Sequence, residues 1–372
     1  MEKLWLNNLR KIDPYVPGEQ SKDKDIVKIN ANENPYPPSP RALEVLKNFD
    51  GGPNEKIIPF LRQAAADGCV LLKNNGALPI NGKDNVALFG RVQNDSFFVG
   101  NGSDDVIALS FQSFFNGDLP IAYPDITYSF YPVWCNLFGI KYVNYPLDEN
   151  FRINVEDYKT KNGGVVIPNP NAPTSIGEGR EFVEKLLDYN RDSVVIIDEA
   201  YVDFGGVSSI ELTKKYENLL VTGTFSKSRS LAGMRIGFAI GSKTLISVLE
   251  AVKNSYNSYT VDALSIAMGI ASVEDDTYFK STVAKIIATR TRVTQELRAL
   301  GFEVIDSQTN FIMATHPDLC IRDLFEYLKS KKVFIRYFNL PRIDNYTRIT
   351  IGTDDEMDIF LNEVKNYLGD KK

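Results

Sequence analysis

Gly-Thr-Phe-Ser-Lys at residues 223–227 is followed closely by Leu-Ala-Gly-Met-Arg-Ile-Gly at residues 231–237. This stretch places one lysine, Lys227, between a predicted strand and an arginine, Arg235, that has glycines on both sides. A lysine in such a setting favours covalent chemistry at its amine.

Two further apolar runs also end in polar residues. Residues 194–197 are Val-Val-Ile-Ile and lead into Asp198 and Tyr201, and residues 165–167 lead into Pro-Asn-Pro-Asn at 168–171. Unbroken runs of β-branched residues indicate strands buried on both faces, as in parallel sheets covered by helices. Ligands of such sheets bind beyond the carboxyl ends of the strands. We therefore expect an asparagine, an aspartate and the lysine to meet at one edge, the candidate active site.

The order of the remaining patterns predicts an α/β fold with two domains. Strand-like and helix-like runs alternate between residues 124 and 270, which is typical of a large, doubly wound, mostly parallel sheet. A long helix over 276–300 then leads into a small α+β domain. We expect residues 1–45 to join the small domain, residues 46–275 to form the large domain, and residues 276–372 to form the small domain.

Individual elements can be predicted within this plan. Helices are expected over residues 41–49, 104–115, 321–330 and 354–368, and strands over 311–314, 333–336 and 348–351. Thr353 and Glu356 have the spacing of a capping box at the start of the last helix.

Composition restricts the class of function. The chain has 372 residues, of which 43% are hydrophobic, and a formal net charge of −6, so it offers no basic surface of the kind that nucleic acid or an acidic membrane binds. The start shows neither a signal peptide nor a membrane span, so a cytoplasmic location is expected. The three cysteines are far apart and His316 is the only histidine, so we expect no disulfides, no metal site and no histidine-based triad.

Pyridoxal phosphate is the cofactor that these residues suit. It requires a lysine amine for its aldehyde, an acid for its ring nitrogen and an aromatic surface for its ring. Lys227 is the predicted catalytic residue, which binds the aldehyde and later moves a proton, and Asp198 is the predicted partner of the ring nitrogen. Tyr201 and Asn171 are predicted to hydrogen-bond the ring oxygen, and Tyr128 to stack on the ring.

The cofactor phosphate needs a site for an anion. The backbone N–H groups of Gly102, Ser103 and Asp104 lie at a predicted helix start, where an anion is favoured. Ser226 and Arg235 are expected to complete the site. Each residue taken alone could be a helix cap, a surface ion pair or part of the core, but their order on successive strands favours one shared cofactor site.

The motifs resemble those of the fold-type I aminotransferases and, within them, the histidinol-phosphate aminotransferase family. They are Asn-Glu-Asn-Pro at 32–35, Val-Gly-Asn-Gly-Ser-Asp at 99–104, Asn-Pro-Asn-Ala-Pro-Thr at 169–174, Asp-Glu-Ala-Tyr at 198–201, Thr-Phe-Ser-Lys at 224–227 and Arg-Ile-Thr-Ile-Gly at 348–352. The resemblance covers residues 1–49 and 92–372.

The resemblance implies an activity and an assembly. The activity is transfer of an amino group from L-histidinol phosphate to 2-oxoglutarate, giving imidazole acetol phosphate and L-glutamate in histidine biosynthesis, and the assembly is a homodimer. It also implies that Arg348, Arg336, Asn32 and Tyr15 bind the substrate, whereas Arg342 matches no motif and is interpreted as surface charge. A threonine-phosphate decarboxylase or an aromatic aminotransferase would share nearly all of these cofactor residues.

Residues 50–91 depart from the family pattern. They lack the expected Tyr-Pro-Asp element, and residues 62–90 instead resemble a fragment of a family 3 glycoside hydrolase, without its catalytic carboxylates. We therefore keep the hypothesis that this chimeric segment impairs cofactor binding or dimerisation, which would leave a catalytically silent protein with the same fold. A smaller departure is Ala172, which stands where many relatives have a second asparagine.

Overall fold

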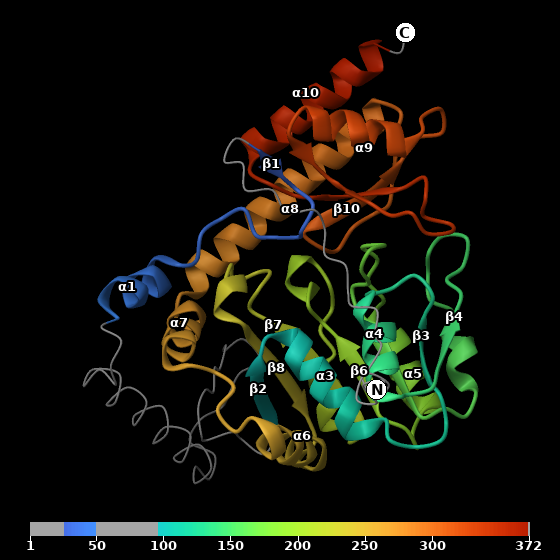
Figure 1. Ribbon diagram of the computed structural model, residues 1–372, viewed down its shortest axis with the longest axis vertical. Coiled ribbons are helices and arrows are strands. Elements are labelled where there is room, and N and C mark those ends of the chain that lie inside the picture. Colours follow the sequence, from blue (N-terminus) through green and yellow to red (C-terminus); the bar gives the residue numbers. More distant parts are fainter. Residues whose placement is uncertain (1–25, 50–95, 371–372) are drawn as a thin grey trace, which may run out of the picture.

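A seven-stranded sheet, here called the large sheet, forms the larger part of the computed structural model, which describes residues 26–49 and 96–370 (Figure 1). Its strands are β2 (Phe97–Asn101), β3 (Ile121–Pro124), β4 (Tyr142–Tyr145), β5 (Gly164–Pro168), β6 (Val195–Asp198), β7 (Leu219–Thr224) and β8 (Ile236–Gly241), in the spatial order β2-β8-β7-β6-β5-β3-β4. Among the described strands of this sheet, β8 runs antiparallel to both β2 and β7, and the other neighbouring pairs are parallel. The predicted α/β class with a mostly parallel sheet is confirmed.

Helices cover both faces of the large sheet. Successive residues of a strand point to opposite faces, so each strand contributes side chains to two cores. Ile196 of β6 packs in a core with side chains of α3 (Ser103–Phe114), α4 (Phe130–Phe138) and α6 (Lys243–Tyr256). Its neighbours Val195 and Ile197 pack in a second core with α5 (Arg180–Tyr189) and the short helices η2 (Val155–Lys159) and η4 (Ile210–Lys214). This double burial is the reason that the strand sequences are apolar without alternation.

A second, smaller layer lies beyond the carboxyl edge of the large sheet. Its four-stranded antiparallel sheet, the small sheet, has the order β12-β13-β10-β9 and consists of β9 (Glu303–Val304), β10 (Phe311–Thr315), β12 (Arg336–Tyr337) and β13 (Thr347–Thr350). Beside it, β1 (Val27–Lys28) pairs in parallel with β11 (Val333–Phe334). Helices α8 (Asp276–Ala299), α9 (Ile321–Ser330) and α10 (Asp354–Asp370) pack against this layer.

One predicted strand is wrong in its extent. The run 333–336 forms two short strands, because Val333 and Phe334 pair with β1 whereas Arg336 pairs with Arg348 of β13. The chain changes partners at Ile335, which is itself buried. The predicted strand is divided because β1, from the N-terminal part of the chain, pairs with its first two residues. No local sequence pattern predicts this pairing.

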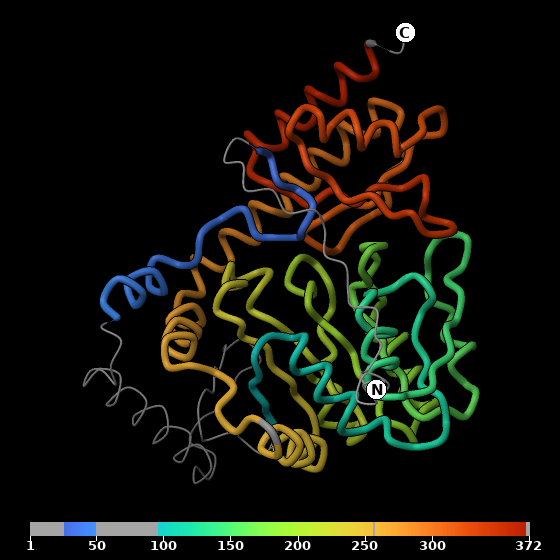
Figure 2. Tube along the Cα trace, viewed as in Figure 1, coloured from blue at the N-terminus to red at the C-terminus, as the bar shows by residue number. Residues whose placement is uncertain are grey.

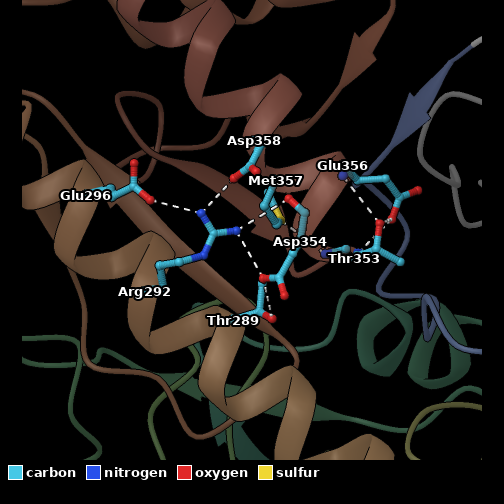
Figure 3. Close-up of polar contacts among 9 residues, drawn as sticks. Thr289, Arg292, Glu296, Thr353, Asp354, Glu356, Met357 and Asp358 are labelled. Carbon is cyan, nitrogen blue, oxygen red and sulfur yellow. Dashed lines mark hydrogen bonds and ion pairs between the residues drawn. The ribbon is translucent and has the colours of Figure 1, made fainter.

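Helix α8 is the long connection between the two layers (Figure 2). Its inner side buries Ile286, Val293 and Leu297 in the core of the small layer. On its outer side, Arg292 binds carboxylates of Glu296, Asp354 and Asp358 at N–O distances of 2.9, 3.0 and 2.7 Å, which ties α8 to the start of α10 (Figure 3).

The last helix begins with the predicted capping box. The Glu356 backbone N–H donates to Thr353 Oγ1 over 3.3 Å, and the Thr353 N–H donates to Glu356 Oε2 over 2.7 Å (Figure 3). A cap of this kind contributes about 1 kcal/mol.

The remaining elements complete the part of the chain that the structure describes. They are α1 (Pro40–Asn48), α7 (Ala263–Glu274), η3 (Val202–Phe204) and η5 (Ala232–Met234), and α1 packs on α7. Within residues 26–49 and 96–370, every helix is too short or too polar to serve as a membrane span. The segment 50–91, with its predicted glycoside hydrolase resemblance, and Tyr15 both lie outside the described residues.

Candidate active site

A cavity of about 770 Å³ lies between the carboxyl edge of the large sheet and the small sheet. Most of the predicted site residues line it: Asn32, Ser103, Asp104, Tyr128, Asp198, Tyr201, Ser226, Lys227, Arg235, Arg336 and Arg348. The strand order explains this meeting, because β5, β6 and β7 are parallel neighbours and end at the same edge.

Asp198 ends β6 and is 5% exposed. Burial raises the pKa of its carboxyl group to about 6, although hydrogen bonds from Tyr131 and the Ala200 backbone and the charge of Lys227 act in the opposite direction. Tyr131 Oη donates to Asp198 Oδ2 over 3.0 Å, and the Ala200 N–H donates to Oδ1 over 3.2 Å. Asp198 is therefore a buried carboxyl group with a fixed orientation, and a cation in the cavity would stabilise its ionised form.

Lys227 lies in the loop that follows β7, three residues beyond Thr224. Its Nζ lies over the ring of Tyr201, 5.7 Å from the centroid, and the Tyr201 hydroxyl accepts a 3.0 Å hydrogen bond from Asn32 Nδ2. Ser226 is held nearby, because Thr224 Oγ1 donates to its hydroxyl over 3.0 Å. The amine, the phenol and the Asp198 carboxylate therefore surround one space.

The start of α3 is the candidate anion site. Gly102 precedes the helix with φ +87°, and among the described residues no side chain caps the helix at this position. A Cβ on Gly102 would lie 2.4 Å from Arg235 Nη2, so the guanidinium lies against the backbone at the helix N-terminus. Gly237 is equally constrained, since a Cβ there would lie 2.2 Å from the Gly102 carbonyl carbon. The backbone N–H dipoles at the N-terminus of α3 and the Arg235 guanidinium are thus directed at the same position, where an anion is favoured.

Asp104 organises the side chains around this anion site. Its Oδ2 accepts a hydrogen bond from Arg235 Nη2 over 3.1 Å, and its Oδ1 accepts one from Tyr128 Oη over 2.9 Å. The carboxylate therefore fixes both the cation and the predicted stacking ring.

Asn171 departs from its predicted position. Its Nδ2 donates to the Ile126 carbonyl and to Thr174 Oγ1, both over 2.9 Å, and its Oδ1 accepts from Thr127 Oγ1 over 3.1 Å. These bonds hold the turn after β5, and it is the next residue, Ala172, that lines the cavity. The structure therefore does not support a direct contact between Asn171 and a ligand in the cavity.

Two arginines form the opposite wall. Arg336 and Arg348 are direct partners on β12 and β13, and both guanidinium groups lie over the ring of Phe338, at 5.5 and 5.7 Å. Arg348 Nη2 donates to the Asn30 carbonyl over 2.9 Å. In the described part of the chain Arg336 forms no ion pair with a carboxylate. This wall suits an anionic ligand group.

Arg342 is an exposed charge, as its sequence context predicted, but it has a further role at the cavity. It lines the cavity, and its guanidinium donates to Asp125 Oδ2 over 3.0 Å and to the carbonyls of Leu147 and Asp148 over 2.8 Å. The loop after β12 is thereby fixed to the large sheet at the cavity. No local pattern could signal this role, because the partners are about 200 residues away.

A family model for class I and II aminotransferases matches residues 24–364. The chain belongs to this family. Curated relatives of this aminotransferase include the histidinol-phosphate aminotransferases of Clostridium acetobutylicum, 46% identical over 368 residues, and of Clostridium botulinum (strain Okra / Type B1), 45% identical over 368 residues. Both alignments cover 99% of this chain, and they cover 100% and 99% of those relatives.

Solved structures agree with the fold of this aminotransferase. The histidinol-phosphate aminotransferase of Clostridium acetobutylicum superposes with a TM-score of 0.75 at 22% identity, covering 92% of this chain and 99% of that one. The enzyme of Sinorhizobium meliloti, solved in complex with pyridoxal-5'-phosphate, gives 0.73 at 22% identity, covering 90% and 88%. Pyridoxal phosphate is the cofactor of class I and II aminotransferases.

Proposed function

We propose that this aminotransferase uses pyridoxal phosphate to move an amino group between L-histidinol phosphate and 2-oxoglutarate. One observation carries the proposal: a lysine amine, a buried carboxylate and a helix N-terminus with an arginine all face one cavity. The names of the relatives with 45–46% identity support the substrate.

The residues present fit this cofactor. The cradle at Gly102, with the Arg235 guanidinium beside it, suits a phosphate. The buried Asp198 suits a protonated ring nitrogen, since a buried carboxylate is stabilised by a cation at its side. The bound cofactor would supply an aldehyde for amine exchange and a ring that withdraws electrons.

The chain's own groups then have separate tasks. Lys227 Nζ takes the proton from the substrate carbon that bears the amino group and returns a proton during the transfer. Asp198, whose pKa is about 6, is ionised at pH 7 and would hold the proton on the ring nitrogen. Tyr201, oriented by Asn32, would donate toward the ring oxygen, and Tyr128, oriented by Asp104, would cover the ring face.

The arginine wall accounts for both substrates. Histidinol phosphate carries a phosphate and 2-oxoglutarate carries carboxylates, and Arg336 and Arg348 can bind either group with charge-assisted hydrogen bonds. A large domain and a small domain, a homodimer and a cytoplasmic location belong to the same proposal.

Borohydride reduction followed by peptide mass analysis tests the cofactor. We expect the cofactor to be fixed on Lys227 in the purified protein and to be lost in Lys227→Ala, with kcat at least about 100-fold lower. Absence of labelling at Lys227 in the wild type would support the catalytically silent protein.

A panel of amino donors with 2-oxoglutarate tests the substrate by the glutamate formed. Histidinol phosphate should be the best donor. Faster turnover of an aromatic amino acid, or release of carbon dioxide from threonine phosphate, would overturn the assignment in favour of the related activities.

A further inference from the structure

Residues 29–34, here called the coupling segment, run between the small sheet and the cavity (Figures 1 and 2). On the small-sheet side the segment is tightly bonded. The Ile29 N–H donates to the Phe334 carbonyl over 3.0 Å, the Thr350 N–H donates to the Ile29 carbonyl over 2.9 Å, and Arg348 donates to the Asn30 carbonyl. The segment therefore moves with the strands that carry the two substrate arginines.

The other end of the coupling segment bonds to the large-sheet side of the cavity. Asn32 Nδ2 reaches the Tyr201 hydroxyl, as described above, and Asn34 Nδ2 donates to the carbonyls of Lys227 and Ser228 over 2.9 and 3.2 Å. Asn34 thus touches the backbone of the residue whose amine faces the cavity.

The loop that carries Lys227 depends on such contacts because it has little regular structure. It extends from the end of β7 at Thr224 to η5, and its backbone bonds include Ser230 N–H to the Lys227 carbonyl over 3.3 Å. The two residues that follow Lys227 have other anchors. Ser228 Oγ donates to Asp203 Oδ2 in η3, and the Arg229 guanidinium lies 4.1 Å from the ring centroid of Phe279 in α8. The Lys227 carbonyl is tied to the coupling segment by Asn34.

An asparagine is chemically suited to this position. While Nδ2 donates to the two carbonyls, Oδ1 accepts a 3.0 Å hydrogen bond from the Tyr36 N–H, which shapes the segment locally. An aspartate would keep the Tyr36 bond. It would lose the donor and place a negative charge against two carbonyl oxygens.

We propose that Asn34 is a positioning residue for Lys227. It fixes the lysine backbone so that the amine lies where proton transfer requires it, and it links that position to the strand of Arg348, which binds the substrate anion. The inference rests on the proposed function in one respect, namely that Lys227 carries the cofactor.

The variants are Asn34→Asp and the matched control Asn218→Asp. Asn218 makes the same kind of cross-link, with Nδ2 donating to the carbonyls of Asn190 and Ser193 over 2.9 Å, but it lies away from the cavity lining. Both changes replace an amide donor that bridges two carbonyls. Any effect seen only at position 34 therefore comes from its place beside Lys227. Asn34→Ala removes the donor without adding a charge.

The first measurement is hydrogen exchange of the peptide covering residues 224–231 in the apoprotein. We expect Asn34→Asp and Asn34→Ala to increase exchange there about tenfold and Asn218→Asp to leave it unchanged. The second measurement is steady-state kinetics. We expect kcat to fall about 10- to 100-fold for Asn34→Asp, because a small displacement of a reacting group has effects of this size, while KM changes less than about threefold.

The rate of borohydride labelling at Lys227 should fall in parallel with kcat. Unchanged exchange and unchanged kcat in both Asn34 variants would overturn the proposal, as would equal losses in Asn218→Asp, which would indicate only a structural role. If the wild type shows no label on Lys227, the proposed function fails. The exchange experiment would still decide whether Asn34 holds the loop.

Discussion

Replacement of Asp198 by asparagine should stabilise the protein in the absence of cofactor. The carboxyl group is 5% exposed, and burial raises its pKa from the ordinary 3.8 to about 6. A pKa shift of this size corresponds to a free-energy difference of about 3 kcal/mol between the two protonation states. The folded protein therefore incurs this amount of free energy when it holds Asp198 in its ionised form.

The sign of the effect sets the pH dependence. Because the folded pKa lies above the unfolded pKa, the contribution of Asp198 to stability is fully present below about pH 4 and is lost as the pH rises to about 6. An asparagine in its place would have no charge to bury, but its single amide oxygen could accept from only one of the two donors, Tyr131 Oη and the Ala200 N–H. That lost bond costs the same at every pH, so the gain in free energy of unfolding for Asp198→Asn should be about 3 kcal/mol larger at pH 7 and above than at pH 4.

Urea unfolding of both apoproteins between pH 4 and pH 8, with the slopes compared, measures this difference. Asp118→Asn is a suitable control, because the Asp118 side chain is fully exposed at 107% of its reference area and its loss should change stability by less than about 0.5 kcal/mol. A gain that is independent of pH, or a wild type that is the more stable protein at pH 8, would refute the reasoning. Cofactor affinity should change in the opposite direction and fall in Asp198→Asn.

Three other changes have expected outcomes. Arg336→Gln removes one of the two charges of the arginine wall, so KM for the phosphorylated donor should rise about 10- to 100-fold in steady-state assays, and an unchanged KM would contradict the role. Arg342→Gln breaks the bonds to Asp125 and to two carbonyls, and should lower the free energy of urea unfolding by about 1–3 kcal/mol. Phe360→Ala opens the core under α10, where Phe360 is 1% exposed, and should cost about 3–5 kcal/mol by the same assay; a loss below about 1 kcal/mol would show that this core collapses around the gap.

Much of the fold could be predicted because its signals are local. The apolar run ending at Asp198 predicts a strand buried on both faces, and its side chains do pack in the cores on both faces of the large sheet. Helix α8 spans residues 276–299, and the predicted helix spans 276–300. The capping box at Thr353 was also visible, since its two partners are three residues apart. The convergence of Asp198 and Lys227 followed from the general rule for parallel strands.

The rest depended on contacts that no local pattern records. Whether Asn171 or Ala172 faces the cavity is decided by the turn after β5, in which the Asn171 amide bonds to Ile126 and Thr174. Arg342 and Asn34 act on groups 217 and 193 residues away, so neither could be assigned from its neighbours in the sequence. The single predicted strand over 333–336 divides for the same reason, because one of its partners is β1.

The pairing of Val27 with Val333 has a consequence for biosynthesis. At about 5–20 residues per second, the ribosome needs roughly 15–60 s to make the residues that separate the two strands. The large sheet can assemble during this interval, whereas β1, a strand of two residues, has no partner until β11 has been made. Chains that terminate before residue 333 cannot form this pair, and they lack the bonds that attach Val27 and Ile29 to the small layer.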